Sequence, residues 1–400
     1  MPSDPTPDRQ RIYLDHAATR FPKPQIVLDT MHSFSQHSEA AMGRGAYRSS
    51  QHAGAIVAQL RREIAQWIAA ENAQEISLHS NCTTALNAGI FGILGDSDHV
   101  VTTAAEHNSV LRPLHHLETL GRIQLTVVPV DRTGRVAVGP LLAAITPATR
   151  MVAVMHAANV NGVVQPIDEI GRALADRYPA DAKPLLLSDT AQTFGHLPIS
   201  VDQSHIDLLA APGHKGGSGP LGTGFLYVRR RLHSQLRPSL FGGTGTHSES
   251  LQMPAEYPSS FEAGNMNVPA LAGWLAGLQE TRQQASPLQH LTASADESQH
   301  LAADLYKRLD AISGVRVIGR PKDLQLPIAS IAIDGLPASD AAMILDSEFG
   351  IEVRSGLHCA ALIHQAIDSP PDGTLRISCG STTRRDELDQ LAAALTELCR

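Results

Sequence analysis

The stretch IDLLAAPGHKGGSGP, residues 206–220, decides the fold prediction together with GFLYV, residues 224–228. Both contain short apolar runs bounded by glycine and proline, which predict two buried strands. Lys215 lies in the glycine-rich turn between them and is one of only five lysines among the 400 residues. Burial lowers the pKa of a lysine and makes its neutral amine a nucleophile and a base. We therefore expect Lys215 to be a Schiff-base lysine.

Apolar runs alternate with helical periodicity around this stretch, from about residue 20 to residue 265. Apolar strands without clean alternation are typical of sheets that are covered on both faces, so the pattern predicts an α/β domain with a largely parallel sheet. Residues 1–50 are expected to be irregular apart from one strand at residues 11–14. We expect strands at residues 75–79, 99–103, 123–130, 151–156, 184–188, 206–211 and 224–229, and helices at residues 53–70, 83–94, 108–120 and 168–178.

The pattern changes near Leu288, where a long helical stretch precedes short strands and further helices. This change predicts a smaller α+β unit at the C-terminus. We expect an N-terminal segment that packs on the small domain (residues 1–19), a large α/β domain (residues 20–265) and the small domain (residues 266–400). In the small domain we expect strands at residues 315–318, 328–333, 351–354 and 375–378, and helices at residues 288–313, from about 339, and from about 383 to 399.

The composition is that of an ordinary globular protein, with 42% hydrophobic and 18% charged residues. A net charge of −8 gives no basic field for nucleic acid or an anionic membrane. The polar N-terminus does not resemble a signal peptide, and no apolar run approaches the roughly 20 residues that cross a bilayer. Four cysteines form no disulfide framework, which favours a cytoplasmic protein, and without a CxxC or HExxH pattern we expect no metal site.

Polar side chains follow several predicted strands at the points where the strands end. Ligands bind at the carboxyl ends of strands in an α/β sheet, so we expect these side chains to lie together. They offer a lysine, a carboxylate to keep a pyridine nitrogen protonated, a flat ring to stack, and a helix N-terminus for a phosphate. Pyridoxal 5'-phosphate requires this set. The residues are Cys82, Thr83, His107, Asn159, Asp189, Gln192, His214 and Lys215.

Each of these residues also has a simpler interpretation when it is taken alone. Thr83 and Asp189 can cap helices, and His107 can be an ordinary loop histidine. Asn159 and Gln192 can be satisfied turn residues. Their joint occurrence, each at the end of a strand, is much harder to obtain by chance and favours the cofactor.

Seven motifs extend this pattern along the chain. They are YLDHAAT (13–19), EHN (106–108), DTAQ (189–192), GHK (213–215), GPLGTG (219–224), FEAG (261–264) and RSGLHCA (354–360). With them the chain resembles class V aminotransferase-like enzymes of fold type I, in particular the cysteine desulfurase and selenocysteine lyase group. It is most similar to the shorter-loop branch, where the nucleophilic cysteine lies in an RxGxHC motif. The resemblance implies a large domain with a mostly parallel, seven-stranded-type sheet and a smaller α+β C-terminal domain.

The resemblance also implies a role for each candidate residue. Lys215 would be the Schiff-base lysine and catalytic base, with His107 on the ring face, Asp189 at the ring nitrogen and Gln192 at the phenolic oxygen. Arg376 would bind the substrate carboxylate, for which a guanidinium is suited; taken alone, it could instead form a strand-end salt bridge. The remaining implied contacts are Thr83 and His214 to the phosphate with the Cys82 amide nearby, Asn159 to cofactor and substrate, and Arg354 to substrate.

Three residues depart from the family pattern. Thr84 stands where the family usually has glutamate, and Pro212 stands where many members have a phosphate-binding hydroxyl. Asn265 follows the FEAG motif, where a threonine of the partner subunit usually reaches the phosphate. The resemblance thereby implies a homodimer in which Asn265 reaches across, and the departures concern the phosphate contacts.

Cys359 distinguishes between the reaction types that this scaffold supports. Taken alone, it could be a small buried core cysteine. It stands among Arg354, Gly356 and His358, however, and nearby cationic groups increase the thiolate fraction of a cysteine. We expect Cys359 to be the nucleophile, and Cys379 and Cys399 to be structural.

The expected activity is that of a pyridoxal-phosphate-dependent cysteine desulfurase, which converts L-cysteine to L-alanine and leaves a persulfide on Cys359. The persulfide sulfur would pass to an acceptor, such as an iron–sulfur scaffold protein. The alternatives are a selenocysteine lyase, a β-eliminating cysteine or cystine lyase that gives pyruvate, and an aminotransferase or epimerase. A sulfur-handling scaffold protein with vestigial activity is an alternative of another class.

Overall fold

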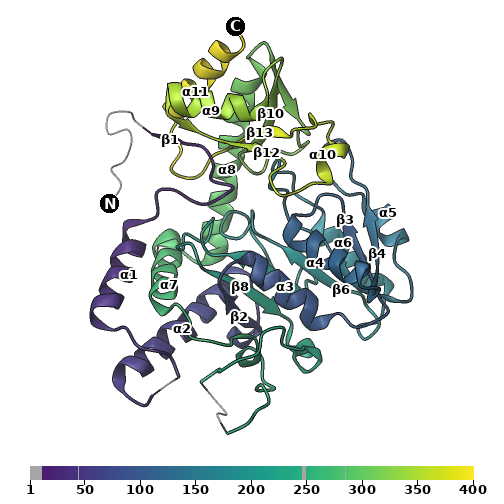
Figure 1. Cartoon of the computed structure of the whole chain (residues 1–400), viewed down its shortest axis with the longest axis vertical. Helices are drawn as coiled ribbons and strands as arrows, with labels where there is room; N and C mark the ends of the chain where they lie inside the picture. The colour runs from purple at the N-terminus through teal and green to yellow at the C-terminus, as the bar shows by residue number, and fades with distance from the viewer. Residues whose placement is uncertain (1–10, 44, 246–248, 284) are drawn as a thin grey trace.

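The computed structural model describes residues 11–43, 45–245, 249–283 and 285–400, and its centre is a seven-stranded sheet (Figure 1). Within this sheet β8 alone runs against its neighbours, and the other strands run in one direction. The prediction of a mostly parallel sheet is therefore confirmed. In spatial order the strands are β2 (Ile76–His79), β8 (Gly224–Val228), β7 (Leu208–Pro212), β6 (Leu185–Asp189), β5 (Thr149–Ala153), β3 (Asp98–Thr103) and β4 (Ile123–Val128).

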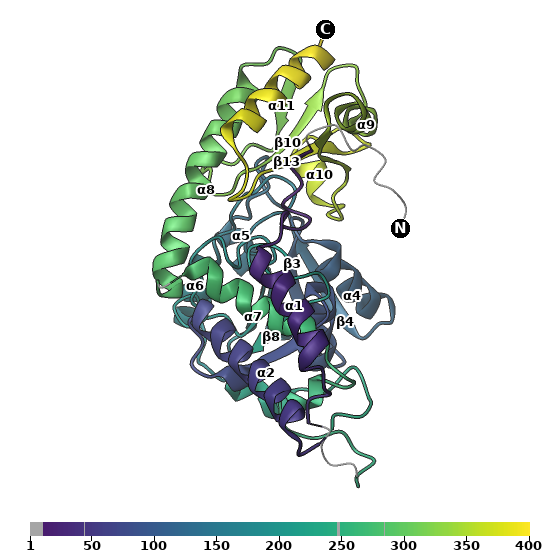
Figure 2. The same cartoon turned by 90° about the vertical axis from the view of Figure 1, so that its left-hand side faces the viewer.

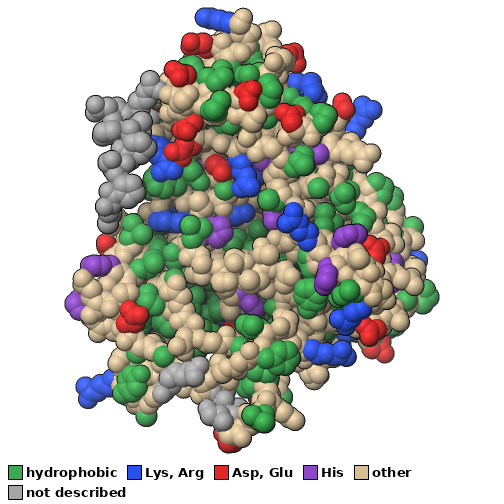
Figure 3. Space-filling model, in the orientation of Figure 1, with side chains coloured by type: hydrophobic (Ala, Val, Ile, Leu, Met, Phe, Trp, Pro, Cys, Tyr) green, Lys and Arg blue, Asp and Glu red, His purple; other side chains and the backbone are tan. Residues whose placement is uncertain are grey.

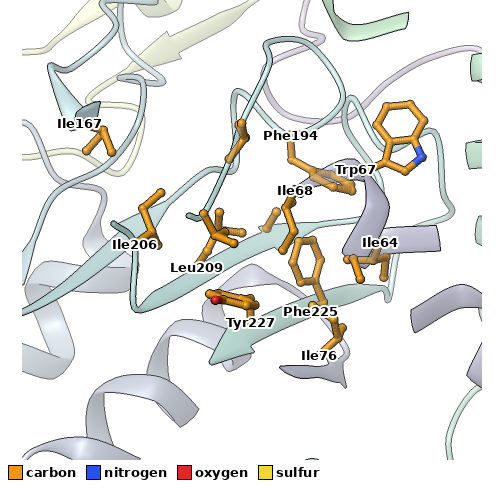
Figure 4. Packing of buried hydrophobic residues seen from close by; sticks show 14 of the residues in the cluster. Ile64, Trp67, Ile68, Ile76, Ile167, Phe194, Ile206, Leu209, Phe225 and Tyr227 are labelled. Atoms are coloured by element: carbon orange, nitrogen blue, oxygen red, sulfur yellow. The ribbon is translucent and has the colours of Figure 1, made fainter. Parts of the chain in front are cut away.

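The central strands are apolar throughout because both faces of the sheet are covered. In β7, Leu209 and Ala211 belong to one buried cluster, while Leu208 and Ala210 belong to another. Figure 4 shows the first cluster, in which Leu209 lies near the rings of Phe225 and Tyr227. The helices of this domain are α1 (Gln25–His37), α2 (Arg48–Trp67), α3 (Cys82–Ile93), α4 (Asn108–Thr119), α5 (Val138–Ala143), α6 (Ile167–Arg177) and α7 (Val268–Arg282).

The C-terminal unit contains a second, antiparallel sheet with its own apolar core. Its strands, in spatial order, are β12 (Arg354–Gly356), β13 (Thr374–Ser378), β10 (Ile328–Ile333) and β9 (Val315–Ile318). Its helices are α9 (Ala338–Phe349), α10 (Ile363–Ala366) and α11 (Arg385–Leu398). The N-terminal β1 (Ile12–Tyr13) pairs in parallel with β11 (Ile351–Glu352), so the start of the described chain packs on this unit.

Helix α8 (Pro287–Asp310) joins the two parts and runs along one side of the molecule (Figure 2). Leu291, near its start, packs into the core of the sheet domain, whereas Leu305 and Leu309 pack into the core of the C-terminal unit. None of the described helices is long and apolar enough to cross a membrane.

The sequence patterns did not specify α1, α5, α7 and α10, and the two longer ones, α1 and α7, were missed for different physical reasons. Helix α1 fully buries only Val27 and Phe34, so its apolar stripe is weak, and the expectation of an irregular segment there was wrong. Helix α7 is apolar nearly all round because it lies between α1 and α2 and the core of the sheet domain, so it has little periodicity.

Two expected boundaries also need comment. The single strand expected at residues 351–354 is two strands, because β11 pairs with β1 while β12 pairs with β13. The division into domains stays a proposal, and the packing of α7 favours a boundary after Arg282 rather than at residue 266. Residues 1–10 of the expected N-terminal segment lie outside the described residues.

Candidate active site

The carboxyl ends of the parallel strands meet at one edge of the large sheet, beneath the C-terminal unit. A cavity of about 200 Å³ lies there. On the face seen in Figure 3, Lys, Arg and His side chains gather in the band between the two parts of the molecule. The candidate residues that line the cavity are Cys82, Thr83, His107, Asn159, Asp189, Gln192, His214, Lys215, Arg354, Cys359 and Arg376. Residues from distant parts of the chain, including the C-terminal unit, thus share one cavity.

Lys215 follows β7 at the base of this cavity. Burial is the main reason that its pKa falls from 10.5 to about 8, and the charge of Arg376 lowers it further. Asp189 opposes this effect. Among the described residues, no side chain forms a hydrogen bond or ion pair with the Lys215 amine. The amine is therefore available for chemistry close to neutral pH.

Asp189 is the last residue of β6 and its side chain is buried. Its Oδ1 accepts a hydrogen bond from the backbone N–H of Ala191 at 2.9 Å, and the Cys82 thiol approaches the same oxygen at 3.6 Å. Within the described part of the chain no donor reaches Oδ2. The carboxylate is held in place with one oxygen left for a ligand. Burial and this carboxylate raise the pKa of the Cys82 thiol, which therefore stays protonated.

His107 caps the N-terminus of α4 and is fixed by its neighbours. Its Nδ1 accepts a hydrogen bond from the backbone N–H of Ser109 at 3.0 Å. Burial lowers the imidazole pKa, so the neutral ring carries its proton on Nε2. The Ser109 hydroxyl lies 2.8 Å from His107 Nδ1 and 2.8 Å from Thr83 Oγ1. Ser109 thereby links two predicted site residues and lines the cavity itself.

The first residues of α3, Cys82 and Thr83, line the cavity at the N-terminus of this helix. The Asn81 side chain caps this helix by accepting from the N–H of Thr84 at 2.9 Å. The Thr84 hydroxyl oxygen in turn accepts a hydrogen bond from the backbone N–H of Asn81 at 3.3 Å. The N–H groups of Cys82 and Thr83 are left for an anion. Thr84, a departure from the family pattern, therefore has a local role as part of the cap.

Gln192 and His214 flank the lysine. Gln192 donates from Nε2 to the backbone oxygen of Ala17 at 3.1 Å, which orients its amide. Burial, followed by the charges of Lys215 and Lys23, lowers the pKa of His214 to about 3. His214 therefore contributes a neutral imidazole to the cavity.

Arg376 lies on β13 and reaches the cavity from the C-terminal unit. Its Nη2 donates to Asp15 Oδ1 at 2.5 Å, and its Nη1 donates to the backbone oxygen of Asn159 at 3.0 Å. Arg376 thus forms the salt bridge that the simpler interpretation predicted. However, the buried Arg376 Nε and the buried Oδ1 of Asn159 have no partner within the described residues. These unsatisfied polar atoms favour a ligand that brings both an acceptor and a donor.

Cys359 lies on the loop after β12 and is exposed at the cavity. His358 and Cys359 both adopt positive φ angles, 49° and 57°, which are uncommon for residues other than glycine. The loop is held by bonds from the N–H of Asn108 to the Cys359 oxygen at 2.7 Å and from Asn159 Nδ2 to the His358 oxygen at 2.6 Å. Arg354 Nη2 lies 3.8 Å from the sulfur. The loop thus presents the thiol to the same cavity as Lys215.

Asn265 is not brought to this cavity. It is exposed and lines a separate hollow with Ser80 and Thr84, on the outer side of the N-terminus of α3. Two residues that do belong to the cavity region were missed as candidates, Ser109 and Asp15. The only sequence signal for Ser109 is its position two residues after His107, at the start of a helix. Asp15 stands in the quoted YLDHAAT motif, but nothing there indicates its pairing with Arg376.

Fold and site together define an α/β enzyme with a lysine amine, a carboxylate and a helix N-terminus converging at the edge of a mostly parallel sheet. The family model described as aminotransferase class-V matches residues 12–391. The chain belongs to the class V aminotransferase family.

Several proteins are similar to this one over almost the whole length of the chain. A probable cysteine desulfurase of Methanothermobacter thermautotrophicus is 33% identical over 98% of this chain and 95% of its own. A probable cysteine desulfurase of Pseudomonas putida is 32% identical over 97% of this chain and 94% of its own. The apo structure of a cysteine desulfurase from Thermococcus onnurineus has a TM-score of 0.86 at 29% identity and covers 97% of this chain and 94% of its own. A cysteine desulfurase from Escherichia coli, in an S-sulfonic acid form, has a TM-score of 0.83 at 26% identity over 97% of this chain and 95% of its own.

Proposed function

We propose that this chain is a pyridoxal-phosphate-dependent cysteine desulfurase, which converts L-cysteine to L-alanine and takes the sulfur onto Cys359. The observation that carries the proposal is that Cys359 and Lys215 line one cavity. A scaffold for aminotransfer or epimerisation alone would need no thiol at that place. The named relatives support the same activity.

The side chains of the cavity fit pyridoxal 5'-phosphate. The open N–H groups at the start of α3, with Thr83 and His214, would hold the phosphate. Asp189 would pair with the ring nitrogen through Oδ2, which has no donor within the described residues. His107 would stack on the ring face, and Gln192 would contact the phenolic oxygen. When bound, the cofactor supplies an electron sink for the carbanion that forms at the substrate Cα.

The residues of this chain would divide the remaining work. Arg376 binds the substrate carboxylate through its guanidinium, whose Nε has no acceptor among the described residues. Asn159 accepts a hydrogen bond from the substrate through Oδ1. Lys215, as the neutral amine, removes the proton from the substrate Cα. Arg354 places a positive charge beside the Cys359 sulfur and would also lie close to the substrate thiol.

The sulfur transfer itself is a displacement at sulfur. The Cys359 thiolate attacks the substrate sulfur, an S–S bond forms, and the substrate Cβ–S bond breaks. The electron pair of the broken bond stays with the carbon fragment, which gains protons and leaves as alanine. Cys359 is left as a persulfide, the sulfur of which passes to an acceptor thiol.

Further parts of the proposal concern partners. The exposed position of Asn265, at the outer side of the α3 N-terminus, supports a homodimer in which Asn265 serves the phosphate of the other subunit. The exposure of Cys359 supports transfer of its sulfur to another protein, such as an iron–sulfur scaffold. We also propose a cytoplasmic location, because free cysteines suit a reducing compartment.

The titration of Lys215 makes the cofactor-free protein a test of the lysine assignment. Its pKa of about 8 lies below the usual 10.5, so the fraction of Lys215 in the reactive neutral form increases as the pH rises through 8. We expect the rate of pyridoxal phosphate attachment to rise about tenfold per pH unit below pH 8 and to level off above it. Stopped-flow absorbance over pH 6–10 measures this rate. A midpoint near 10.5 would contradict the depressed pKa.

Product analysis with L-cysteine tests the function as a whole. The purified holoenzyme, with a reductant present, is expected to form alanine and sulfide in equal amounts and no pyruvate. Pyruvate and ammonia would support the β-eliminating lyase instead. Faster turnover of selenocysteine than of cysteine would support the selenocysteine lyase, and absence of any turnover or spectral change would support a vestigial scaffold protein.

A further inference from the structure

A second cavity also reaches Lys215. Its volume is about 450 Å³, and it opens between the start of α8, the end of α7 and the segment at residues 16–24. Of the residues that the structure describes, Lys215 alone lines both this cavity and the active-site cavity. The groups that matter for its chemistry are Arg20, His16, His196, His290, Glu280 and Glu297.

Arg20 is a largely buried cation without an acidic partner in the part of the chain that the structure describes. One of its terminal nitrogens donates to the hydroxyl of Ser218, and its Nε is buried without an acceptor. Among the described residues no carboxylate forms an ion pair with Arg20, and burial alone accounts for its lowered pKa. Other largely buried arginines of this protein are paired, as Arg61 is with Glu262 at 2.6 Å and Arg376 with Asp15 at 2.5 Å. A buried unpaired guanidinium is costly, so Arg20 has a place open for an anion.

Three imidazoles surround this guanidinium. Burial lowers the pKa of His16 and of His196 to about 4, with further lowering by their neighbours, and burial also lowers that of His290. All three rings are therefore neutral at pH 7 and add no charge. The His16 ring already bonds to the backbone of Tyr13, so His196 and His290 are the rings that can offer an N–H to a ligand. In the holoenzyme, where the Lys215 amine would be bound to the cofactor, Arg20 is the main cationic group for an anion that enters this cavity.

The acidic groups of the cavity are at its mouth. Glu280 and Glu297 are both exposed, whereas Arg20 lies deeper. Two carboxylates at the mouth repel a dianion such as sulfate or phosphate, while one guanidinium at the base attracts a single negative charge. The ligand chemistry that matches is one carboxylate group, which a guanidinium can bind through two parallel hydrogen bonds.

We propose that this second cavity is a binding site for a small monocarboxylate, held by Arg20 and the neighbouring imidazoles. The site is separate from the reaction that we propose for Lys215 and Cys359. Its test therefore does not depend on turnover.

The test compares Arg20→Met with Arg61→Met in the holoenzyme by thermal unfolding. Without added carboxylate, Arg20→Met is expected to be at least as stable as the unaltered protein, because an unpaired buried charge is removed. Arg61→Met is expected to unfold at a lower temperature, because Glu262 is left buried and unpaired. If Arg20→Met is destabilised as much as Arg61→Met, Arg20 is a structural group and the proposal is wrong.

Propionate, added against chloride at constant ionic strength, then probes the site directly. The midpoint of the unaltered protein is expected to rise saturably by at least about 2 °C. Arg20→Met should lose much of that rise. Arg376→Met, which removes the carboxylate-binding group of the active-site cavity, should keep the share of the rise that is due to Arg20. An unchanged response in Arg20→Met, or no rise beyond that in chloride, would overturn the proposal.

Sulfate distinguishes the ligand class from general salt stabilisation. The difference between the unaltered protein and Arg20→Met should be larger in propionate than in sulfate, because Glu280 and Glu297 oppose a second negative charge. An equal difference in the two salts would overturn the monocarboxylate assignment. Arg20→Gln, which keeps a donor for Ser218, is measured beside Arg20→Met and should show the same loss of the propionate response.

Discussion

Cys359→Ala is expected to reduce alanine formation from L-cysteine by at least about 10³-fold, because the variant has no thiolate to receive the substrate sulfur. The rest of the cavity should be unaffected, since Cys359 is exposed and its side chain supports no other described group apart from the contact with Arg354. The visible absorbance of the bound cofactor should therefore persist. Amino acid analysis of the reaction, together with the absorbance spectrum, measures both quantities.

Cys399→Ala is the matched control for this variant. Cys399 caps the end of α11 and does not line the cavity, and burial raises its pKa, so it is a poor nucleophile at neutral pH. We expect this control to keep its alanine formation within about twofold. Full desulfurase turnover in Cys359→Ala would refute the assignment of Cys359. Loss of cysteine turnover with selenocysteine turnover retained would favour the selenocysteine lyase.

The sequence was most informative where chemistry coincides with the end of a strand. Asp189, His107 and Lys215 were predictable because parallel strands bring their carboxyl ends to one edge, whatever the details of packing. The fold class followed from the same alternation of apolar runs and helices. For these residues it was enough to know which residue follows each strand, because the parallel sheet brings the strand ends close together.

The rest depended on contacts between distant parts of the chain. The pairing of Asp15 with Arg376 joins residues 361 positions apart, and Ser109 acts through its bonds to Thr83 and His107. Helix α7 has little periodicity because neighbours cover it nearly all round. Arg20 bonds to Ser218 but has no acidic partner among the described residues, and no sequence motif records a missing partner. Tertiary packing, rather than local propensity, decides each of these features.

Lys215→Ala is expected to abolish covalent attachment of the cofactor and to lower alanine formation by at least about 10³-fold. The physical argument is one of position rather than of pKa alone. Lys23 also has a pKa of about 8, lowered by burial and then by Arg20, yet it does not line the active-site cavity. Its Nζ donates to the backbone oxygen of His214 at 2.6 Å, so its amine is already engaged.

Borohydride reduction followed by mass analysis separates these two lysines. Reduction fixes a lysine-bound cofactor permanently, so the unaltered protein and Lys23→Met should each gain the mass of one reduced cofactor, whereas Lys215→Ala should gain none. We expect Lys23→Met to keep alanine formation within about tenfold. A trapped cofactor in Lys215→Ala would show that another amine can serve, and the role of Lys215 would then have to be given up. Lys215, three residues after β7, lines the cavity together with Asp189, whereas Lys23 does not. Position at the sheet edge should therefore decide which of the two amines, whose pKa values are both about 8, reacts.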